Sequence, residues 1–392
     1  MPEGKALASI PVPIHLQRPY LRPPEQAAFL RAANTTFATN PCSYCKDHPP
    51  KPQHFLDGAV LGGFRVSARR VQLDGGDGGF YVPDELESIA MMTYSSGREH
   101  AVFAMVKAAL QNGGHCRRRG GARRIVLDIG ANEGFFGLLA ASWGCLTYLF
   151  EPQPSCQAAL YSALLLNSFG TDVARVVPRP VSAEPFEMLV SPSVPCVGQF
   201  PRNPQSYDER KHPLILQRRR DRRLVGSVNA SDVLPAGPLL LAKVDVDGGE
   251  LGVLESLLPL MRRRLLHNVV VEITPGWWPG GEPKYGCTGE RGCVSAARAA
   301  RIGRAVDEAG YAVMPIPVHG WPAACDPEGI GQRSAALRKL GRDRLFARAG
   351  FAPATGSRCA FSDFLNRTMD QMLYDVWTQD VWLALQGARP FL

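Results

Sequence analysis

Glycines and carboxylates occur in the sequence at a spacing that suits a nucleoside-binding site. The first group follows a short apolar run and contains Asp128, Gly130, Asn132 and Gly134. The glycines allow a tight turn and a close approach of the backbone to a ligand. Exposed amides at the start of a following helix suit a polar or anionic group. A purely structural turn is the alternative interpretation of the glycines alone.

An acidic residue stands where a nucleoside-binding unit needs one. Glu151 ends the next apolar run, 21 positions after Gly130, and Pro152 follows it. An acidic side chain at this point can bind both hydroxyls of a ribose. A solvated loop glutamate is the alternative, but the two features together favour nucleoside binding. The glycine spacing differs from the dinucleotide pattern GxGxxG, which argues against a nicotinamide oxidoreductase.

A third group places charge at the end of another predicted buried strand. It contains Lys243, Asp245, Asp247 and Glu250. In an open α/β sheet the carboxyl ends of the strands form the edge where ligands bind. Charges there are costly unless they are paired or used. Lys243, Asp245 and Asp247 share one strand face, although a lysine–aspartate pair could also be structural.

Strands and helices must alternate to bring these three groups together. Short apolar runs predict buried parallel strands, and amphipathic or apolar stretches between them predict helices. The sequence therefore predicts an α/β fold with a mostly parallel, doubly wound sheet. The predicted strands cover 80–82, 125–129, 146–150, 175–181, 239–246, 268–273 and 311–318, and the helices 98–111, 135–143, 155–167, 251–261 and 295–309, the last capped by Ser295.

The pattern divides the chain into three parts. Residues 1–79 are rich in proline and glycine and are predicted to form an irregular amino-terminal segment. Residues 80–320 form the Rossmann-like domain, with a loop insertion at 191–223 that is rich in proline and arginine. Residues 321–392 are predicted to be a carboxy-terminal extension that packs on the core.

The chemistry-bearing stretches, taken in order, resemble a known family. VLDIGANEGFFGLLAASWG, YLFEPQP and LLLAKVDVDGGELGVLESLLPLM look like the successive segments DVGANxG, FEPxP and KIDVEGxE of FkbM-type methyltransferases. The resemblance spans roughly residues 80–275. It implies a class I methyltransferase fold, S-adenosyl-L-methionine (SAM) as methyl donor, and commonly a hydroxyl oxygen as acceptor.

The resemblance also assigns roles to residues. It places Asp128, Gly130, Asn132 and Gly134 on the methionine side of SAM, Glu151 and Pro152 at the ribose, Ser182 at the adenine and Asp245 at the transferring methyl group. Asp245 is predicted to be the base or to position the acceptor, with support from Lys243 and Glu250. Three positions depart from the family pattern: Asp247 replaces a glutamate, Pro180 an alanine and Thr274 a histidine.

A hydroxyl on a sugar or small metabolite is the acceptor that the resemblance suggests. Arginine runs such as 117–119 and 218–220 raise the alternative of a nucleic-acid methyltransferase. However, the expected DPPY-like tetrapeptide is replaced by Asp245-Val-Asp-Gly248 and no aromatic residues interleave with the arginines. A catalytically silent SAM-binding or interaction protein is a further alternative. No metal is assigned, although paired carboxylates could bind one.

Composition leaves the compartment and the oligomeric state open. The chain of 392 residues has a net charge of +8 and the hydrophobic content of a globular protein. Neither a secretory signal nor a membrane-spanning run is visible, which favours the cytoplasm. Sequons at Asn34, Asn229 and Asn366 would matter in a lumenal protein.

The ten cysteines give no clear metal pattern. Cys145 and Cys156 lie within apolar stretches and are interpreted as small buried hydrophobic residues. Cys42 and Cys45, with His48, resemble half of a zinc site. A second cysteine pair does not follow, so a local disulfide or two free thiols are favoured there.

Overall fold

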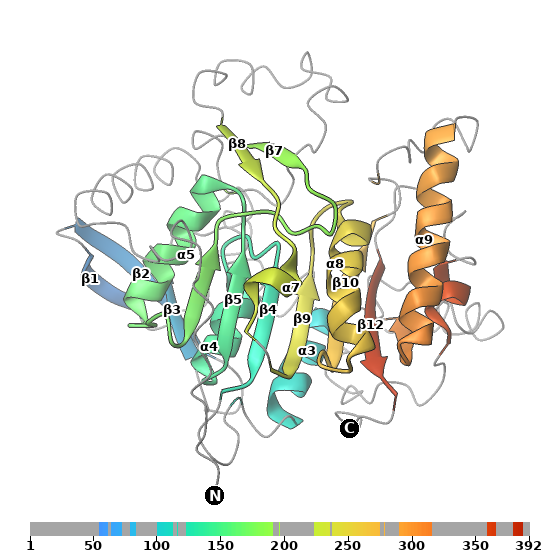
Figure 1. Ribbon diagram of the computed structural model, residues 1–392. Helices are drawn as coiled ribbons and strands as arrows, with labels where there is room; N and C mark the ends of the chain where they lie inside the picture. The colour runs from blue at the N-terminus through green and yellow to red at the C-terminus, as the bar shows by residue number, and fades with distance from the viewer. Residues whose placement is uncertain are drawn as a thin grey trace, which may run out of the picture.

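Figure 1 shows a computed structural model of the chain. The structure describes residues 55–61, 64–72, 79–83, 100–112, 116, 123–190, 196, 223–235, 237–274, 278, 290–315, 359–365 and 379–386. Cys42, Cys45, His48 and the sequons at Asn34 and Asn366 lie outside these residues.

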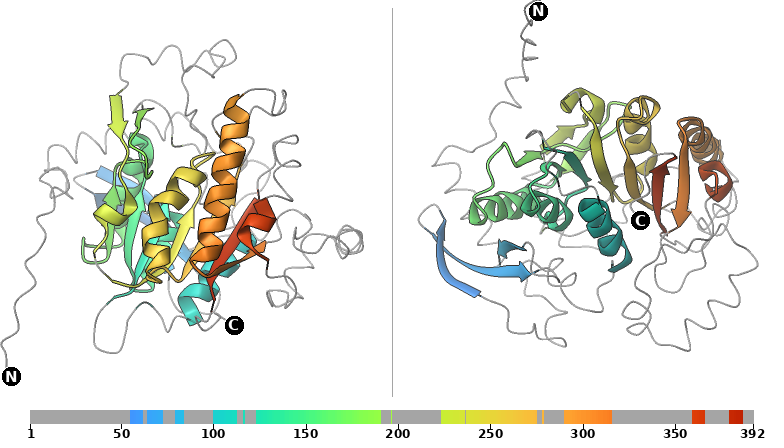
Figure 2. Two further views of the ribbon diagram at one scale, coloured as in Figure 1. Left: turned by 45° about the vertical axis from the view of Figure 1, so that its right-hand side comes forward. Right: turned by 90° about the horizontal axis from the view of Figure 1, so that it is seen from below.

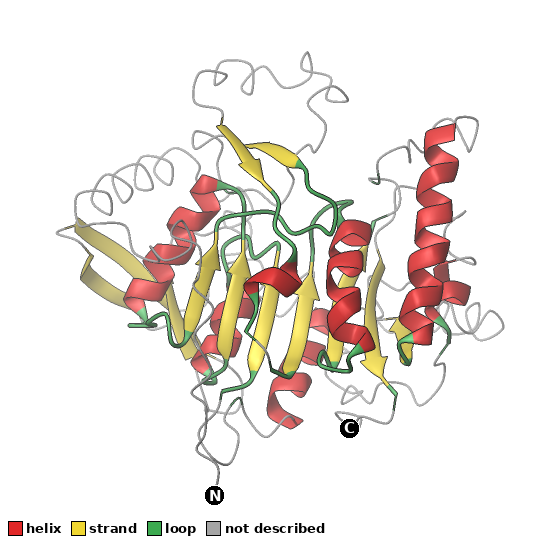
Figure 3. Ribbon diagram, in the orientation of Figure 1, coloured by secondary structure: helices red, strands yellow, loops and turns green. Residues whose placement is uncertain are grey.

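A seven-stranded sheet forms the centre of the molecule (Figure 3). Its strand order is β11-β12-β10-β9-β4-β5-β6, and all strands run parallel except β12, which is antiparallel to both neighbours. This order confirms the predicted class I, Rossmann-like methyltransferase fold. The strands are β4 (Ile125–Ile129), β5 (Leu146–Phe150), β6 (Ala174–Val177), β9 (Leu239–Val244), β10 (Asn268–Ile273), β11 (Tyr311–Pro315) and β12 (Gln379–Leu385).

Helices cover both faces of this sheet, and two apolar clusters fill the space beneath them. One cluster joins α3 (His100–Asn112), α4 (Phe135–Ser142) and α5 (Pro154–Leu166) to the sheet. The other joins α7 (Ala230–Val233), α8 (Glu250–Arg262) and α9 (Glu290–Glu308). Figure 2 shows the two layers from below. Because both faces are covered, β4 and β9 are buried along their whole length, which explains their continuous apolar sequences.

Local patterns located these elements, with small errors at their ends. The predicted strand 175–181 ends at Val177, and Val181 instead forms an isolated bridge with Val228. The last predicted helix begins earlier than expected, at Glu290, so Ser295 lies inside it and is not its cap.

Several strands lie where the sequence predicted no regular structure. β1 (Phe55–Leu61) and β2 (Phe64–Gln72) form a small antiparallel sheet with β3 (Gly79–Pro83). This sheet lies against α4 and α5, and the rings of Phe80 and Phe135 are 5.8 Å apart. β7 (Glu187–Val190) and β8 (Arg223–Gly226) pair across the predicted insertion. β12 lies inside the main sheet, so the segment after residue 320 supplies one of its strands.

Disulfides correct the interpretation of two cysteines. Cys145 and Cys156 are completely buried, as expected, but each is bonded: Cys116 to Cys145 and Cys156 to Cys196. Cys359 is also disulfide-bonded. The partners are 29 and 40 residues apart, so no local pattern could pair them. Among the described helices, none has the length and apolar character needed to cross a bilayer.

The turn after β4 requires glycine at position 130, and this requirement can be tested. Gly130 has a φ of +77°, and a Cβ there would overlap the carbonyl oxygen of Asp245. Gly310 has a similar φ of +86° but open space around a Cβ. Gly310→Ala should therefore lower the free energy of unfolding by about 1–2 kcal/mol, and Gly130→Ala should lower it by clearly more. Denaturant titration measures both; equal losses would show that the overlap is relieved at no cost.

Candidate functional site

The three chemistry-bearing groups meet at one edge of the sheet. The chain passes from β4 outward to β5 and β6, then returns to place β9 and β10 on the other side of β4. The strand order therefore reverses between β4 and β9. In open α/β sheets the crevice for ligands lies at such a switch point, outside the carboxyl ends of the strands. The turns after β4, β5 and β9 all lie at that edge (Figure 1).

The turn after β4 is held against β5 by backbone hydrogen bonds. The N–H groups of Gly130 and Ala131 both donate to the carbonyl oxygen of Phe150, each at 3.0 Å. Asn132 then adopts the left-handed conformation with φ +52°, which asparagine tolerates better than most residues. Gly134 has φ +88° and starts α4. The predicted tight turn is therefore present, and its geometry explains the residue types.

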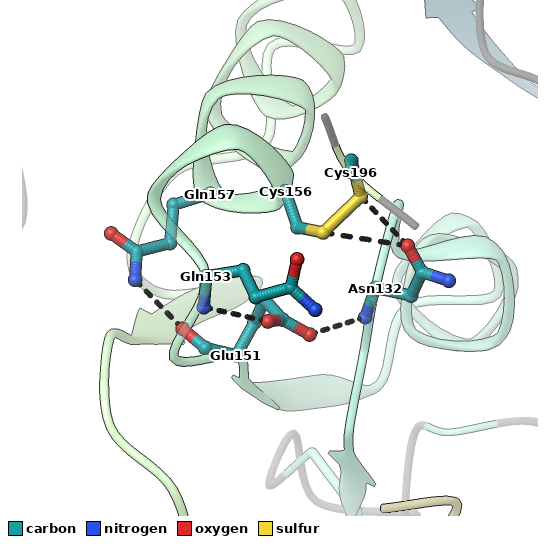
Figure 4. The surroundings of a disulfide bond; sticks show 6 residues. All are labelled: Asn132, Glu151, Gln153, Cys156, Gln157 and Cys196. Carbon is teal, nitrogen blue, oxygen red and sulfur yellow. Dashed lines mark hydrogen bonds between the residues drawn. A yellow bond between two sulfur atoms is a disulfide. The ribbon is translucent and has the colours of Figure 1, made fainter. Parts of the chain in front are cut away.

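Glu151 lies next to this turn and joins it to the start of α5 (Figure 4). Its Oε2 accepts the backbone N–H of Asn132, and its Oε1 accepts that of Gln153, both at 2.8 Å. Only 4% of the residue is exposed. Each carboxylate oxygen has a second lone pair, so two further donors, such as the hydroxyls of a ribose, can be accepted. The interpretation as a solvated loop glutamate is therefore wrong.

Burial makes the carboxyl group of Glu151 a weaker acid than that of an exposed glutamate. Desolvation raises the pKa of Glu151 to about 7. The two backbone N–H groups and Lys243 favour the ionised form, whereas Asp128 adds to the rise. Glu151 therefore titrates near neutral pH.

Asp128 lies beneath the turn, away from the surface. Its Oδ2 accepts the N–H of Gly137 at 2.7 Å in the first turn of α4. Its Oδ1 is buried and has no hydrogen-bond donor among the described residues. Burial raises the pKa of Asp128 to about 6, with Lys243 acting in the opposite direction. Asp128 thus anchors α4 and places a buried carboxyl beside the site.

Lys243 and Asp245 form the predicted pair at the end of β9. The Nζ of Lys243 donates to Oδ2 of Asp245 at 2.8 Å, and it also lies 5.1 Å from the ring centre of Phe136. Lys243 is opposite Asp128 in the pairing of β9 with β4. The lysine is buried, while 29% of the Asp245 side chain is exposed. Asp245 is therefore the member of the pair that can meet a substrate.

Two more carboxylates lie beside Asp245. Oxygen atoms of Asp245, Asp247 and Glu272 are all within 4.8 Å of one another. Such acidic groups are common without a bound ion, and the cluster by itself indicates only a negative potential. Glu272 was not predicted as a site residue, although its position near the end of β10 was a usable signal.

Glu250 has a positioning role in the structure. It is fully buried, and its Oε1 accepts the N–H of Gly248 at 2.5 Å. Its Oε2 accepts the indole N–H of Trp278 at 2.6 Å. Glu250 therefore connects the turn after β9 with Trp278, in the chain after β10. Sequence reasoning missed Trp278, because a tryptophan beyond a strand end carries no motif.

Pro152 and Ser182 lie at the border of the site. Pro152 follows Glu151 and is half-buried. The backbone N–H of Ser182 donates to Val228 at 2.9 Å, and its hydroxyl accepts the N–H of Glu184 at 3.2 Å. Gly252 of α8 packs against it. Ser182 therefore joins the segment after β6 to α8, where the resemblance places the adenine.

The arrangement fits a nucleoside that carries a positive charge. Glu151 keeps lone pairs for two hydroxyls beside the turn from Gly130 to Gly134, whose residues are buried or half-buried. Among the described residues, Asp128, Glu151 and Asp245 all interact with the charge of Lys243, which leaves an excess of negative charge when all are ionised. A cationic ligand group would relieve this excess.

The raised pKa of Glu151 predicts how stability depends on pH. Between its ordinary value of 4.5 and about 7, the folded chain holds a proton that the unfolded chain releases. The free energy of unfolding of the wild type should fall as pH rises through this window, relative to Glu151→Gln, which does not titrate. The relative loss should reach about 3 kcal/mol. Denaturant titrations at pH 4 and pH 8, on either side of this window, measure the loss, and parallel pH dependence of the two proteins would contradict the raised pKa of Glu151.

The chain has distant structural likenesses. No family model and no curated protein matches it. A crystal structure of WbdD is 16% identical and matches over 48% of this chain and 32% of that chain, with a TM-score of 0.27.

Two further structures are similar to the chain at the same level. Methyltransferase FkbM from Methylobacillus flagellatus KT is 14% identical over 47% of this chain and 48% of that chain, with a TM-score of 0.26. Geranyl diphosphate methyltransferase, in complex with GPP and sinefungin, is 11% identical over 91% and 98%, with a TM-score of 0.31. The chain spans less than two thirds of the WbdD and FkbM structures. The strand order of the main sheet therefore establishes the fold.

Proposed function

We propose that the chain is a SAM-dependent methyltransferase of the FkbM type that methylates a hydroxyl group of a sugar or small metabolite. The observation that carries the proposal is the buried carboxylate of Glu151 at the end of β5. It is fixed by two backbone N–H groups beside the glycine turn after β4. A nucleoside-binding βαβ unit needs an acidic group at that place.

Different site residues would contact different parts of the cofactor. Glu151 would accept hydrogen bonds from the ribose hydroxyls, with Pro152 against the sugar. The turn from Gly130 to Gly134 would lie along the methionine part. Ser182 would border the adenine. Asp128 would act through its charge, because its buried carboxyl faces the start of α4.

Asp245 would serve the acceptor. SAM supplies an activated methyl group on a sulfonium when it is bound. The acceptor hydroxyl must lose its proton as its oxygen gains the methyl group, and the partly exposed carboxylate of Asp245 can take that proton. Lys243 holds Asp245 in place through a 2.8 Å ion pair. Alignment of donor and acceptor would supply much of the rate gain.

The cofactor assignment predicts the effect of Glu151→Ala. The variant loses both hydrogen bonds to the ribose and should bind SAM and S-adenosylhomocysteine about 100-fold more weakly or worse. Calorimetry measures the affinities, and circular dichroism checks that the fold is kept. Glu308→Ala is the matched control, because Glu308 is exposed at the end of α9. Wild-type affinity in the Glu151 variant would refute the assignment.

The base assignment predicts a different result for Asp245→Asn. This variant should keep SAM affinity within about threefold and transfer methyl groups about 100-fold more slowly. A panel of sugars and small hydroxyl compounds with radiolabelled SAM identifies the acceptor and gives the rate. Asp232→Asn serves as the control, since Asp232 is exposed on α7. A near-normal rate in Asp245→Asn would exclude Asp245 as the base.

A further inference from the structure

The Cys156–Cys196 disulfide contacts the proposed cofactor site directly. Its two sulfur atoms lie beside Oδ1 of Asn132, with Cys196 at 2.7 Å and Cys156 at 3.5 Å (Figure 4). A disulfide sulfur has no hydrogen to donate, so the bonded pair holds this side chain by contact. The backbone N–H of the same Asn132 donates to Glu151. A continuous chain of contacts therefore runs from the disulfide to the buried carboxylate.

We propose that this disulfide positions Asn132, and through it Glu151, for binding the adenosyl cofactor. The inference rests on the proposed function and adds a redox dependence to the same site. Support from its side chain matters because the left-handed backbone of Asn132, at φ +52°, costs asparagine less than most residues but more than glycine. If the side chain is released, the backbone can relax and its N–H can turn away from Glu151.

The disulfide also connects distant parts of the chain at this point. Cys156 is in the first turn of α5, whose start supplies the second N–H to Glu151 through Gln153. Cys196 follows β7 by several residues, and the two Cα atoms are 4.7 Å apart. The bond therefore fixes a residue from beyond β7 against the turn after β4.

Breaking the bond has a defined chemistry. A dithiol reductant donates two electrons and two protons, the S–S bond becomes two thiols, and the reductant closes its own disulfide. Disulfides persist in oxidising compartments and are reduced in the cytosol. The cofactor affinity of this chain should therefore be higher in an oxidising compartment.

The second disulfide provides a matched control. Cys145 directly precedes β5, and Glu151 directly follows it, so the two residues lie at opposite ends of the same strand. Cys116 pairs with Cys145 at that far end. Removal of either bond takes one cross-link from the chain, but only the Cys156–Cys196 bond contacts Asn132.

The experiment compares Cys156→Ala/Cys196→Ala with Cys116→Ala/Cys145→Ala and the wild type. Alanine is chosen because serine would place a new donor beside Asn132. Calorimetry with S-adenosylhomocysteine should show about tenfold weaker binding for the first pair, as for one lost hydrogen bond to a charged group. The control pair should remain within about twofold of the wild type.

A pH profile separates positioning from general loss of stability. The N–H of Asn132 is one of the groups that lower the pKa of Glu151, along with the N–H of Gln153 and the charge of Lys243, whereas Asp128 raises it. Loss of the Asn132 hydrogen bond should therefore raise the pKa of Glu151. The pH at which cofactor binding reaches half of its maximum, the midpoint, should then be higher in Cys156→Ala/Cys196→Ala and unchanged in the control variant. If the first pair does not fold, limited reduction of the Cys116→Ala/Cys145→Ala protein gives the same test. Alkylation and peptide mapping should show that the Cys156–Cys196 bond has opened while Cys359 stays bonded, and reoxidation should reverse the change.

The outcomes are distinguishable. If the wild type fails to bind S-adenosylhomocysteine, the proposed function is wrong. If the wild type binds and the first pair keeps its affinity and midpoint, only the inference about the disulfide is overturned. Equal weakening by both pairs with an unchanged midpoint would also overturn it. Alkylation of unreduced protein should leave Cys156 and Cys196 unmodified, and labelling of both would show that the bond is not formed.

Discussion

The buried carboxylate of Glu151 is the interaction on which the rest of the site depends. It accepts one N–H from the turn after β4 and one from the start of α5, so a single side chain connects two neighbouring strand-to-helix turns. Burying a carboxylate is costly unless its oxygens are hydrogen-bonded. The two amides supply this compensation in part, because the pKa of Glu151 still rises to about 7. The fold therefore keeps an incompletely compensated carboxylate at the place where a ligand could donate hydrogen bonds to it.

Other carboxylates at the ends of the strands are also incompletely compensated. Asp128 and Glu151 are buried near Lys243, which is already paired with Asp245 at 2.8 Å. Buried carboxylates near a single lysine cost stability, because desolvation can exceed the attraction between the charges. A ligand with a positive centre would complete the charge balance, and SAM carries one at its sulfonium. This electrostatic argument is independent of the family resemblance and favours a ligand with a positive centre, as the proposed cofactor has.

The sequence located the strands and the turns at their carboxyl ends well, because these features are encoded locally. Apolar runs of five or six residues predicted β4, β5, β9 and β10, and a residue at the end of such a run must lie at the edge of the sheet. Gly130, Glu151 and Asp245 could be placed together on that basis alone. The strands β1, β2 and β12 were missed, since β12 is defined by its antiparallel partners β10 and β11 rather than by its own pattern.

Contacts over long sequence distances explain the features that no local pattern revealed. Trp278 reaches Glu250 from the chain after β10, and Cys196 reaches Asn132 from beyond β7. Each connects a segment without a recognisable motif to a turn that had one. A methyltransferase can bind its donor with short turns at fixed strand ends, whereas recognition of an acceptor is left to longer connections that vary freely. For this reason the sequence predicts a donor more readily than an acceptor, while the contacts of Trp278 and Cys196 are seen only in the folded chain.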